Sequence, residues 1–106
     1  MNQRDLEVMN ILYTTNEAMT GTDITECKKG LTQSTVIAVL RKLLKEGLIE
    51  VAGVVHSGKV LSRTYRPTAK AKEALLEHFD QQYNLFCNVI SPDELLAFIS
   101  RSRHYQ

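Results

Sequence analysis

The sequence predicts a mainly α-helical fold with one small β-hairpin, arranged as a winged helix-turn-helix with two further helices after it. Three observations support this class. Apolar residues recur at helical spacing in three short segments before residue 47, each with its own start signal. A β-branched run and a return strand follow directly, around a Ser-Gly turn. Three helices followed by a hairpin is the element order of the winged helix-turn-helix.

The first helix is expected over residues 3–15. Asn2 or Asp5 can cap its start, and Asn16 ends it. Thr20 begins a Thr-x-x-Asp pattern, which is close to a capping box and predicts the start of a short second helix. The apolar positions that give the first helix its spacing are Leu6, Met9, Leu12 and Tyr13.

The third helix is expected over residues 33–46, with Thr32 as its cap and Gly47 ending it in a left-handed conformation. Its apolar stripe, which should face the core, consists of Val36, Val39, Leu40 and Leu43. The opposite face mixes apolar with polar residues, which is unusual for a face in water. That outer face comprises Gln33, Ser34, Ile37, Ala38 and Arg41.

The hairpin is expected directly after the third helix. Residues 48–55 are strand formers, residues 56–59 are expected as the turn, and residues 60–66 as the return strand. Pro67 stops the second strand because it has no N–H to donate to a ladder. Residues 18–20 could add a third short strand.

Two helices are expected after the hairpin. Thr68 is placed to cap the first, and Ser91, followed by a proline and then by Glu94, starts the second. We therefore expect a winged-helix domain over residues 1–67 and a C-terminal helical region over residues 68–106. The apolar residues along these two helices are Ala71, Leu75, Leu76, Phe79, Tyr83, Phe86, Leu95, Leu96, Phe98 and Ile99.

Length and composition limit the class of protein. A chain of 106 residues with 43% apolar and 24% charged residues fits one globular domain and excludes a disordered chain. No apolar run approaches the ~18 residues of a membrane span, and the N-terminus lacks the apolar stretch of a signal peptide. We therefore expect a cytoplasmic protein without membrane contact. Two widely separated cysteines do not predict a disulfide scaffold.

The net charge of +1 hides a strong asymmetry along the chain. Residues 28–72 hold ten basic and two acidic side chains. The segments on either side are acidic, with one basic and five acidic residues in 1–27 and two basic and five acidic residues in 73–106. A basic middle of this kind is typical of a surface that binds a polyanion.

The outer face of the third helix suits the edges of DNA bases better than water. Gln33 could pair bidentately with adenine, and Arg41 could bind guanine or hold a phosphate. Ile37 or Ala38 could contact thymine methyl groups. A second interpretation of Ile37 is ordinary packing against another helix.

Phosphate contacts are expected around this face. Ser34 and Thr35 lie beside the free amides at the start of the third helix. Lys59 at the hairpin tip and Arg63 on the return strand would hold the flanking backbone. The two lysines at the back of the helix fit phosphate contact or plain solvation equally well. The predicted DNA-binding residues are Thr32, Gln33, Ser34, Thr35, Ile37, Ala38, Arg41, Lys42, Lys45, Lys59 and Arg63.

The sequence offers little other chemistry. His56, His78 and His104 have no metal-ligand spacing with one another or with the two cysteines. No glycine-rich phosphate loop and no Gly-x-Ser-x-Gly elbow occurs. We expect no enzyme activity, no catalytic residue, no metal and no cofactor.

Three segments of the chain resemble the DNA-binding region of the penicillinase repressor family, which includes the BlaI, MecI and CopY-type regulators. They are DLEVMNILY at residues 5–13, MTGTDI at 19–24 and STVIAVLRKLLKEGLIE at 34–50. The resemblance implies a bacterial repressor that binds a palindromic operator as a homodimer, with residues 32–45 as recognition helix and C-terminal dimerisation helices. The candidate dimerisation residues are Leu75, Phe79, Tyr83, Phe86, Leu95, Leu96 and Ile99, some of which could instead cover the domain's own core.

The C-terminal region departs from the two known control routes of this family. Copper-responsive members carry Cys-x-Cys motifs there, whereas this chain has only Cys87. β-Lactam-responsive members are cleaved at an Asn-Phe bond, and the nearest counterpart here is Asn88-Val89. Copper sensing and that cleavage are therefore not expected.

The function predicted from these features is a sequence-specific DNA-binding transcriptional repressor, with double-stranded DNA and a second copy of the chain as partners. Two alternatives stay open. One is a ligand-responsive regulator of the MarR or PadR sort, in which a small molecule is the effector. The other is a winged-helix protein-interaction module that binds no DNA.

Overall fold

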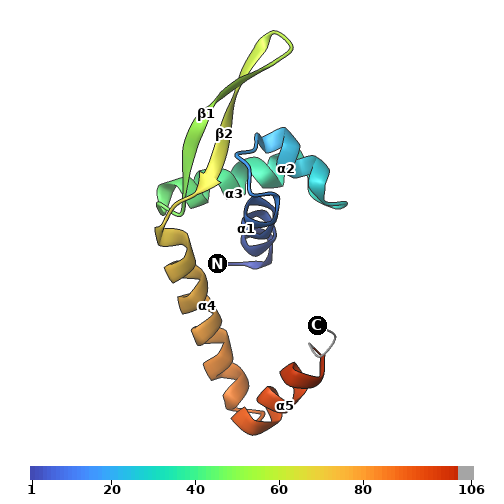
Figure 1. The fold of residues 1–106 in the computed structure, drawn as a ribbon, viewed down its shortest axis with the longest axis vertical. Helices are drawn as coiled ribbons and strands as arrows, with labels where there is room; N and C mark the ends of the chain where they lie inside the picture. Colours follow the sequence, from blue (N-terminus) through green and yellow to red (C-terminus); the bar gives the residue numbers. More distant parts are fainter. Residues whose placement is uncertain (103–106) are drawn as a thin grey trace. The chain divides into compact units, whose positions relative to one another are not determined.

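A computed structural model gives the fold and describes residues 1–102 (Figure 1). Three helices are followed by an antiparallel hairpin and two more helices, as the sequence predicts, so the winged helix-turn-helix is confirmed. The elements are α1 (Gln3–Thr15), α2 (Gly21–Cys27), α3 (Gln33–Lys45), β1 (Ile49–Ser57), β2 (Val60–Pro67), α4 (Lys70–Cys87) and α5 (Pro92–Ser102).

The chain divides into two compact units, residues 1–74 and 75–106. The first unit holds the winged helix and the start of α4, and the second holds the rest of α4 with α5. The sequence divides the chain differently, into a DNA-binding domain over residues 1–67 and a dimerisation region over residues 68–106. This division by function stays a prediction.

Local capping signals set the starts of the first two helices. Asn2 caps α1 by accepting from the Asp5 N–H at 2.9 Å, and the Asp5 carboxylate accepts from the Asn2 N–H at 3.0 Å. Thr20 and Asp23 repeat this reciprocal pair at 3.1 Å for α2. Asn16 ends α1 in the left-handed region, with φ 55°. Both residues proposed as the α1 cap therefore take part in one capping box.

The core of the first unit forms around α3. Thr32 caps this helix at 3.2 Å, and Gly47 follows it with φ +76°, as predicted. The helix ends at Lys45, one residue before the expected end, with Glu46 as its cap. All four residues of the predicted apolar stripe are buried, which directs the opposite face outward. The buried apolar side chains are Val8, Met9, Ile11, Leu12, Met19, Ile24, Leu31, Val36, Val39, Leu40, Leu43, Leu48, Ile49 and Ala71.

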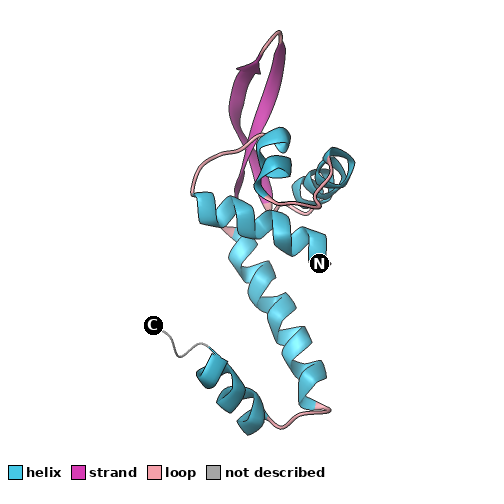
Figure 2. Ribbon diagram, turned by 90° about the vertical axis from the view of Figure 1, so that its right-hand side faces the viewer, coloured by secondary structure: helices cyan, strands magenta, loops and turns pink. Residues whose placement is uncertain are grey.

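The hairpin turn is tighter than the sequence suggested. His56 and Ser57 belong to β1, and Ser57 pairs with Val60, so the loop is only Gly58 and Lys59. The prediction of a turn over residues 56–59 was therefore wrong. Gly58 adopts φ +66°, and this positive φ is what a two-residue hairpin loop requires. The hairpin consequently reaches well past the helices of its unit (Figure 2).

Hydrogen bonds attach the hairpin to the helical part of its unit. Met19 pairs with Tyr65 through two backbone hydrogen bonds of 3.1 and 2.8 Å, so the third strand suggested over residues 18–20 is a single bridge. The Thr68 hydroxyl donates to the Gly47 carbonyl at 2.7 Å. Thr68 thus ties the end of β2 to the end of α3, rather than capping α4 through its side chain as predicted.

One ion-pair cluster joins α1 to the turn after α2. The Glu7 carboxylate accepts from Lys28 and, at 2.8 Å, from Arg4. These two hydrogen bonds lower the pKa of Glu7 below its usual value, and the bond from Lys28 has the larger effect. Two of the chain's basic residues are therefore used within the fold.

Within the second unit, α5 begins where the sequence predicts. The Ser91 hydroxyl accepts from the Glu94 N–H at 3.2 Å, and Pro92 occupies the first helical position. No side chain of residues 75–102 is buried. Among residues 1–102, every helix is too short or too polar to span a bilayer.

Candidate nucleic-acid interface

The outer face of α3 is open to solvent. All five residues assigned to it from the sequence are exposed: Gln33, Ser34, Ile37, Ala38 and Arg41. Ile37 is 43% exposed, which argues against its packing against another helix within residues 1–102. A half-exposed isoleucine beside an arginine provides both an apolar contact and a donor fork on one helix face.

A groove of about 410 Å³ runs along this face. The start of α2, the outer face of α3 and the strand β2 line it. Gln33, Ile37 and Arg41 contribute from α3, and Arg63 contributes from β2. The fold therefore brings one residue of the hairpin, which is the wing of this fold, and three residues of α3, up to thirty positions apart in sequence, into one concave surface.

Thr22 holds the side chain of Gln33 in this groove. The Gln33 Nε2 atom donates to the Thr22 hydroxyl at 3.1 Å. The second N–H of this amide and its Oε1 atom stay available. One donor and one acceptor are what a glutamine needs to pair with the edge of adenine. Thr22 was not predicted as a site residue, because it lies inside the Thr-x-x-Asp capping pattern and has no local signal of its own. Tyr65 and Ser62 also line the groove and were not predicted.

The start of α3 uses some of its polar groups internally. The Thr32 hydroxyl accepts from the Thr35 N–H at 3.2 Å and donates to the Thr35 hydroxyl at 3.0 Å. The amides of Gln33 and Ser34 precede the first helical hydrogen bond and point out of the helix end. These two amides, with the exposed Ser34 hydroxyl, form the most suitable phosphate site on this helix.

The ion pairs separate the basic residues into two groups. Among the described residues, Arg4 and Lys28 bond to Glu7, Lys42 bonds to Asp5, and Arg66 bonds to Glu50. The exposed cations of residues 1–102 that form no ion pair are Lys29, Arg41, Lys45, Lys59, Arg63, Lys70, Lys72 and Arg101. Four of the predicted DNA-binding cations are in this second group, whereas Lys42 is not.

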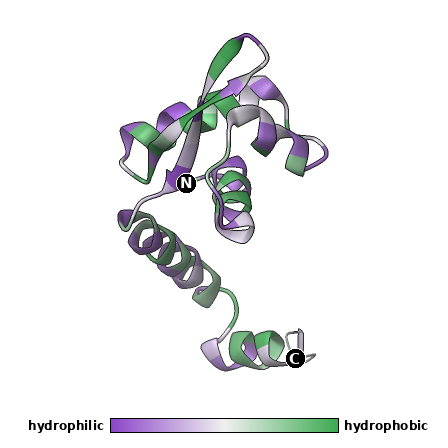
Figure 3. Ribbon diagram, turned by 45° about the horizontal axis from the view of Figure 1, so that its top comes forward, coloured by the Kyte–Doolittle hydropathy of each residue, from purple (hydrophilic) through white to green (hydrophobic). Residues whose placement is uncertain are grey.

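The wing exposes apolar as well as basic side chains. Val54, Val55, Val60 and Leu61 are 44–65% exposed on either side of the turn. Figure 3 shows the hydrophobic colour on the hairpin near its tip. Lys59 occupies the turn between them and is exposed, as is His56. A hairpin of this kind can rest on the sugar edges of a groove while its cation meets a phosphate.

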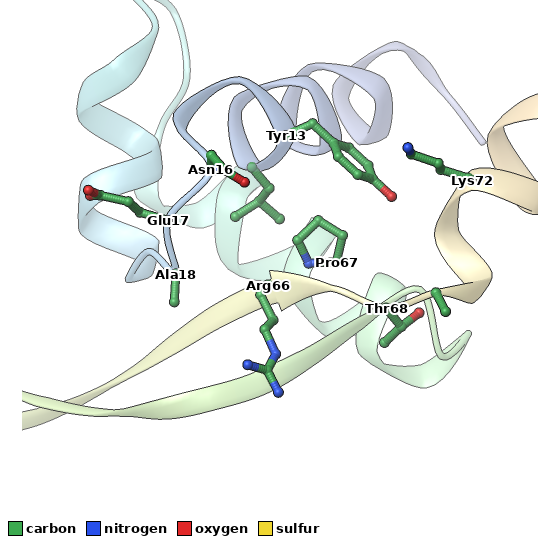
Figure 4. Close-up of a pocket in the computed structure, with 10 residues that line it drawn as sticks. Tyr13, Asn16, Glu17, Ala18, Arg66, Pro67, Thr68 and Lys72 are labelled. Carbon is green, nitrogen blue, oxygen red and sulfur yellow. The ribbon is translucent and has the colours of Figure 1, made fainter.

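A second hollow, of about 620 Å³, lies where α1 and β2 end and α4 begins (Figure 4). The Lys72 amine points toward the Tyr13 ring, 6.0 Å from its centroid, while Arg66 points away from that ring. The Arg66 Nε atom donates to Glu50 at 2.7 Å. Glu17 contributes an acid to the same hollow, so its lining favours neither sign of charge. It includes none of the predicted site residues.

The second unit carries the predicted dimerisation residues. Phe79, Phe86, Leu96 and Ile99 are 44–61% exposed, while Leu75, Tyr83 and Leu95 are half-buried. A cleft of about 590 Å³ on this unit is lined mainly by Phe86, Ile90, Leu95 and Phe98. A hydrogen bond with the Cys87 thiol, one turn along α4, raises the pKa of Tyr83.

Within residues 1–102, no three His, Cys, Asp or Glu side chains cluster in a way that could hold a metal. His104, one of the histidines considered from the sequence, lies outside the described residues.

A model of the penicillinase repressor family matches residues 1–106. Comparison with curated proteins gives no match. Among solved structures, Bacillus subtilis PadR in complex with operator DNA is similar, with a TM-score of 0.62 and 22% identity. That match covers 74% of this chain but 48% of PadR, so the chain spans about half of that protein's length.

Two further structures are similar to nearly the whole chain. An S. aureus MepR variant bound to an oligodeoxyribonucleotide has a TM-score of 0.58 and 20% identity, covering 95% of this chain and 74% of that one. A PadR family regulator from Clostridium difficile R20291 has a TM-score of 0.59 and 20% identity, covering 90% and 99%. At these identities the likeness establishes the winged-helix fold.

Proposed function

This chain belongs to the penicillinase repressor family, and from that premise we propose that it is a sequence-specific DNA-binding repressor that acts as a homodimer on a palindromic operator. The observation that carries the proposal is the groove on the outer face of α3. It joins Gln33, Ile37 and Arg41 to Arg63 of the wing, on the basic segment of the chain.

In the proposed mode, α3 enters the major groove and its outer face meets the base edges. Gln33, held by Thr22, pairs with an adenine, and Arg41 pairs with a guanine or a nearby phosphate. Ser34 and the free amides at the start of α3 bind a phosphate. Lys59 and Arg63 then hold the backbone beside the major groove.

The exposed apolar residues of α4 and α5 supply the second half of the proposal. A monomer that leaves Phe79, Phe86 and Leu96 more than half exposed presents an apolar surface that association would bury. A second copy is the partner that the family suggests. Two recognition helices would then lie about one helical turn apart, ~34 Å. Occupancy of a promoter by such a dimer blocks transcription, and the site of action is the bacterial cytoplasm.

The family match favours this function over the two alternatives. A ligand-responsive regulator needs an effector, and the mixed lining of the hollow beside Tyr13 favours no particular one. A protein-interaction module would have no reason to place unpaired cations along α3 and the wing. Fluorescence anisotropy with a random-sequence duplex at low salt decides this last point, because absence of binding would leave only the interaction module.

Lys59→Ala tests the wing in the same assay. We expect weaker binding to every sequence, and a slope of log K against log[salt] that is about 0.9 smaller, since one phosphate contact is lost. Lys70→Ala removes the same charge from an exposed position outside the predicted contact set, and should leave the slope near that of wild type. An unchanged slope in Lys59→Ala would remove the wing tip from the contact list.

A further inference from the structure

Asp5 is a charged side chain that the fold has enclosed. It is only 1% exposed. Its Oδ2 atom accepts from the Asn2 N–H at 3.0 Å and from the Lys42 amine at 2.7 Å. Its Oδ1 atom is buried without a hydrogen-bond partner among the described residues. Burial of a carboxylate is costly unless a cation compensates it, so the Lys42 contact is the one that makes this burial tolerable.

Lys42 reaches Asp5 from a different element, 37 residues further along the chain. At about 100° per residue, Lys42 lies on the flank of α3, between the buried stripe and the outer face. Its amine is turned toward α1, and the hydrogen bond to Asp5 raises the pKa of Lys42. The amine therefore stays charged, and its charge is already matched by an acid of the same chain.

The two kinds of contact that hold α3 differ in directionality. The apolar stripe of Val36, Val39, Leu40 and Leu43 favours burial but tolerates small rotations of the helix, because hydrophobic contact has no preferred direction. A charge-assisted hydrogen bond at 2.7 Å has a narrow geometry. The carboxylate that accepts it is itself fixed by the α1 capping box, so the reference point is rigid.

We propose that Lys42 is a positioning residue and not a phosphate contact: its bond to Asp5 sets the rotation of α3 about its axis and thereby aligns Gln33, Ile37 and Arg41 with the base edges. This inference rests on the proposed DNA-binding function. It separates Lys42 from Lys45, although the sequence gives the two lysines the same expected role.

The two roles predict opposite results in DNA binding. A phosphate contact adds to affinity for every sequence and to the salt dependence. A positioning contact changes the preference for one sequence over others and leaves the salt dependence alone, since the number of neutralised phosphates does not change. The measurement is therefore anisotropy over a range of KCl concentrations with two probes: a duplex selected from a random library by the wild-type protein, and a random-sequence duplex of equal length.

For Lys42→Met we expect the ratio of selected to random affinity to fall roughly tenfold, as for a poorly aligned bidentate contact, with an unchanged salt slope. The Lys42→Arg variant should keep more of the ratio of selected to random affinity than Lys42→Met, because arginine can also pair with Asp5. Lys45→Met is the matched control and should lower the slope while keeping the ratio. Circular dichroism at the assay temperature establishes that each variant is folded.

Asp5→Asn changes the acceptor of the same hydrogen bond. It keeps the shape of the capping residue but removes its charge, so the ratio should fall as in Lys42→Met, while the freed amine steepens the salt slope. A smaller slope with an intact ratio in Lys42→Met would overturn the proposal in favour of a phosphate contact. An unchanged ratio and slope in both variants would overturn it as well. Failure of the wild-type protein to bind either duplex would instead contradict the proposed function itself.

Discussion

Phe79→Glu is expected to prevent the proposed dimer from forming and to lower affinity for a two-half-site operator by a factor of ~100 or more. Phe79 is 61% exposed on α4 and stacks on Tyr83 with ring centroids 6.1 Å apart. A carboxylate placed in an apolar interface without a cation beside it costs on the order of several kcal/mol, and this cost opposes association. Each monomer would then bind one half-site without the high effective concentration that the partner supplies.

Sedimentation velocity over a range of protein concentrations measures the first effect, and anisotropy at fixed salt measures the second. Gln81→Glu is the matched control, because it adds the same charge at an exposed position two residues along α4, on the opposite side of the helix. The control should remain dimeric. A dimeric Phe79→Glu protein with wild-type affinity would exclude this face of α4 from the interface.

Arg41→Ala is expected to weaken binding to the operator by ~1–3 kcal/mol, the usual loss for a good bidentate base contact. Arg41 is exposed on the outer face of α3 and lines the groove with Gln33 and Arg63. Its removal leaves a guanine edge without its donor fork, so the loss should fall on the cognate sequence more than on random DNA. Anisotropy titrations on both duplexes at one salt concentration measure the difference.

Arg41→Lys distinguishes the two roles that Arg41 can have. Lysine keeps the charge but lacks the planar fork, so it replaces a phosphate contact and fails as a guanine reader. If Arg41 reads a base, the lysine variant should lose nearly as much specificity as the alanine variant. Equal operator binding by wild type and Arg41→Ala would show that Arg41 has neither role.

The parts of the fold that the sequence predicts well are those with local causes. The starts of α1, α2, α3 and α5 follow from capping residues within three positions of the helix start, and the end of α1 follows from Asn16. The left-handed Gly47 follows from the preference for glycine just after a helix, and the buried stripe of α3 follows from helical spacing. The outer face of α3 was predictable for the same reason, since it is the complement of the stripe.

The features that escaped prediction depend on contacts between distant segments. Thr68 bonds to Gly47 and not to its own helix, and no local pattern indicates that choice. The pairing of Lys42 with Asp5 needs α1 and α3 to be packed first. The hydrogen bond between Gln33 and Thr22 likewise forms only when α2 and α3 are packed together. The hairpin turn was misplaced because His56 and Ser57 are compatible with both turn and strand, and only the register with β2 decides between them.

Selection of bound duplexes from a random library tests the central proposal most directly, because it reports binding, sequence preference and half-site spacing together. The wild-type chain should enrich an inverted repeat whose half-site centres are about one helical turn apart, ~34 Å. Recovery of an unenriched pool, or of a single half-site without a repeat, would contradict a dimer that reads its operator through the outer face of α3.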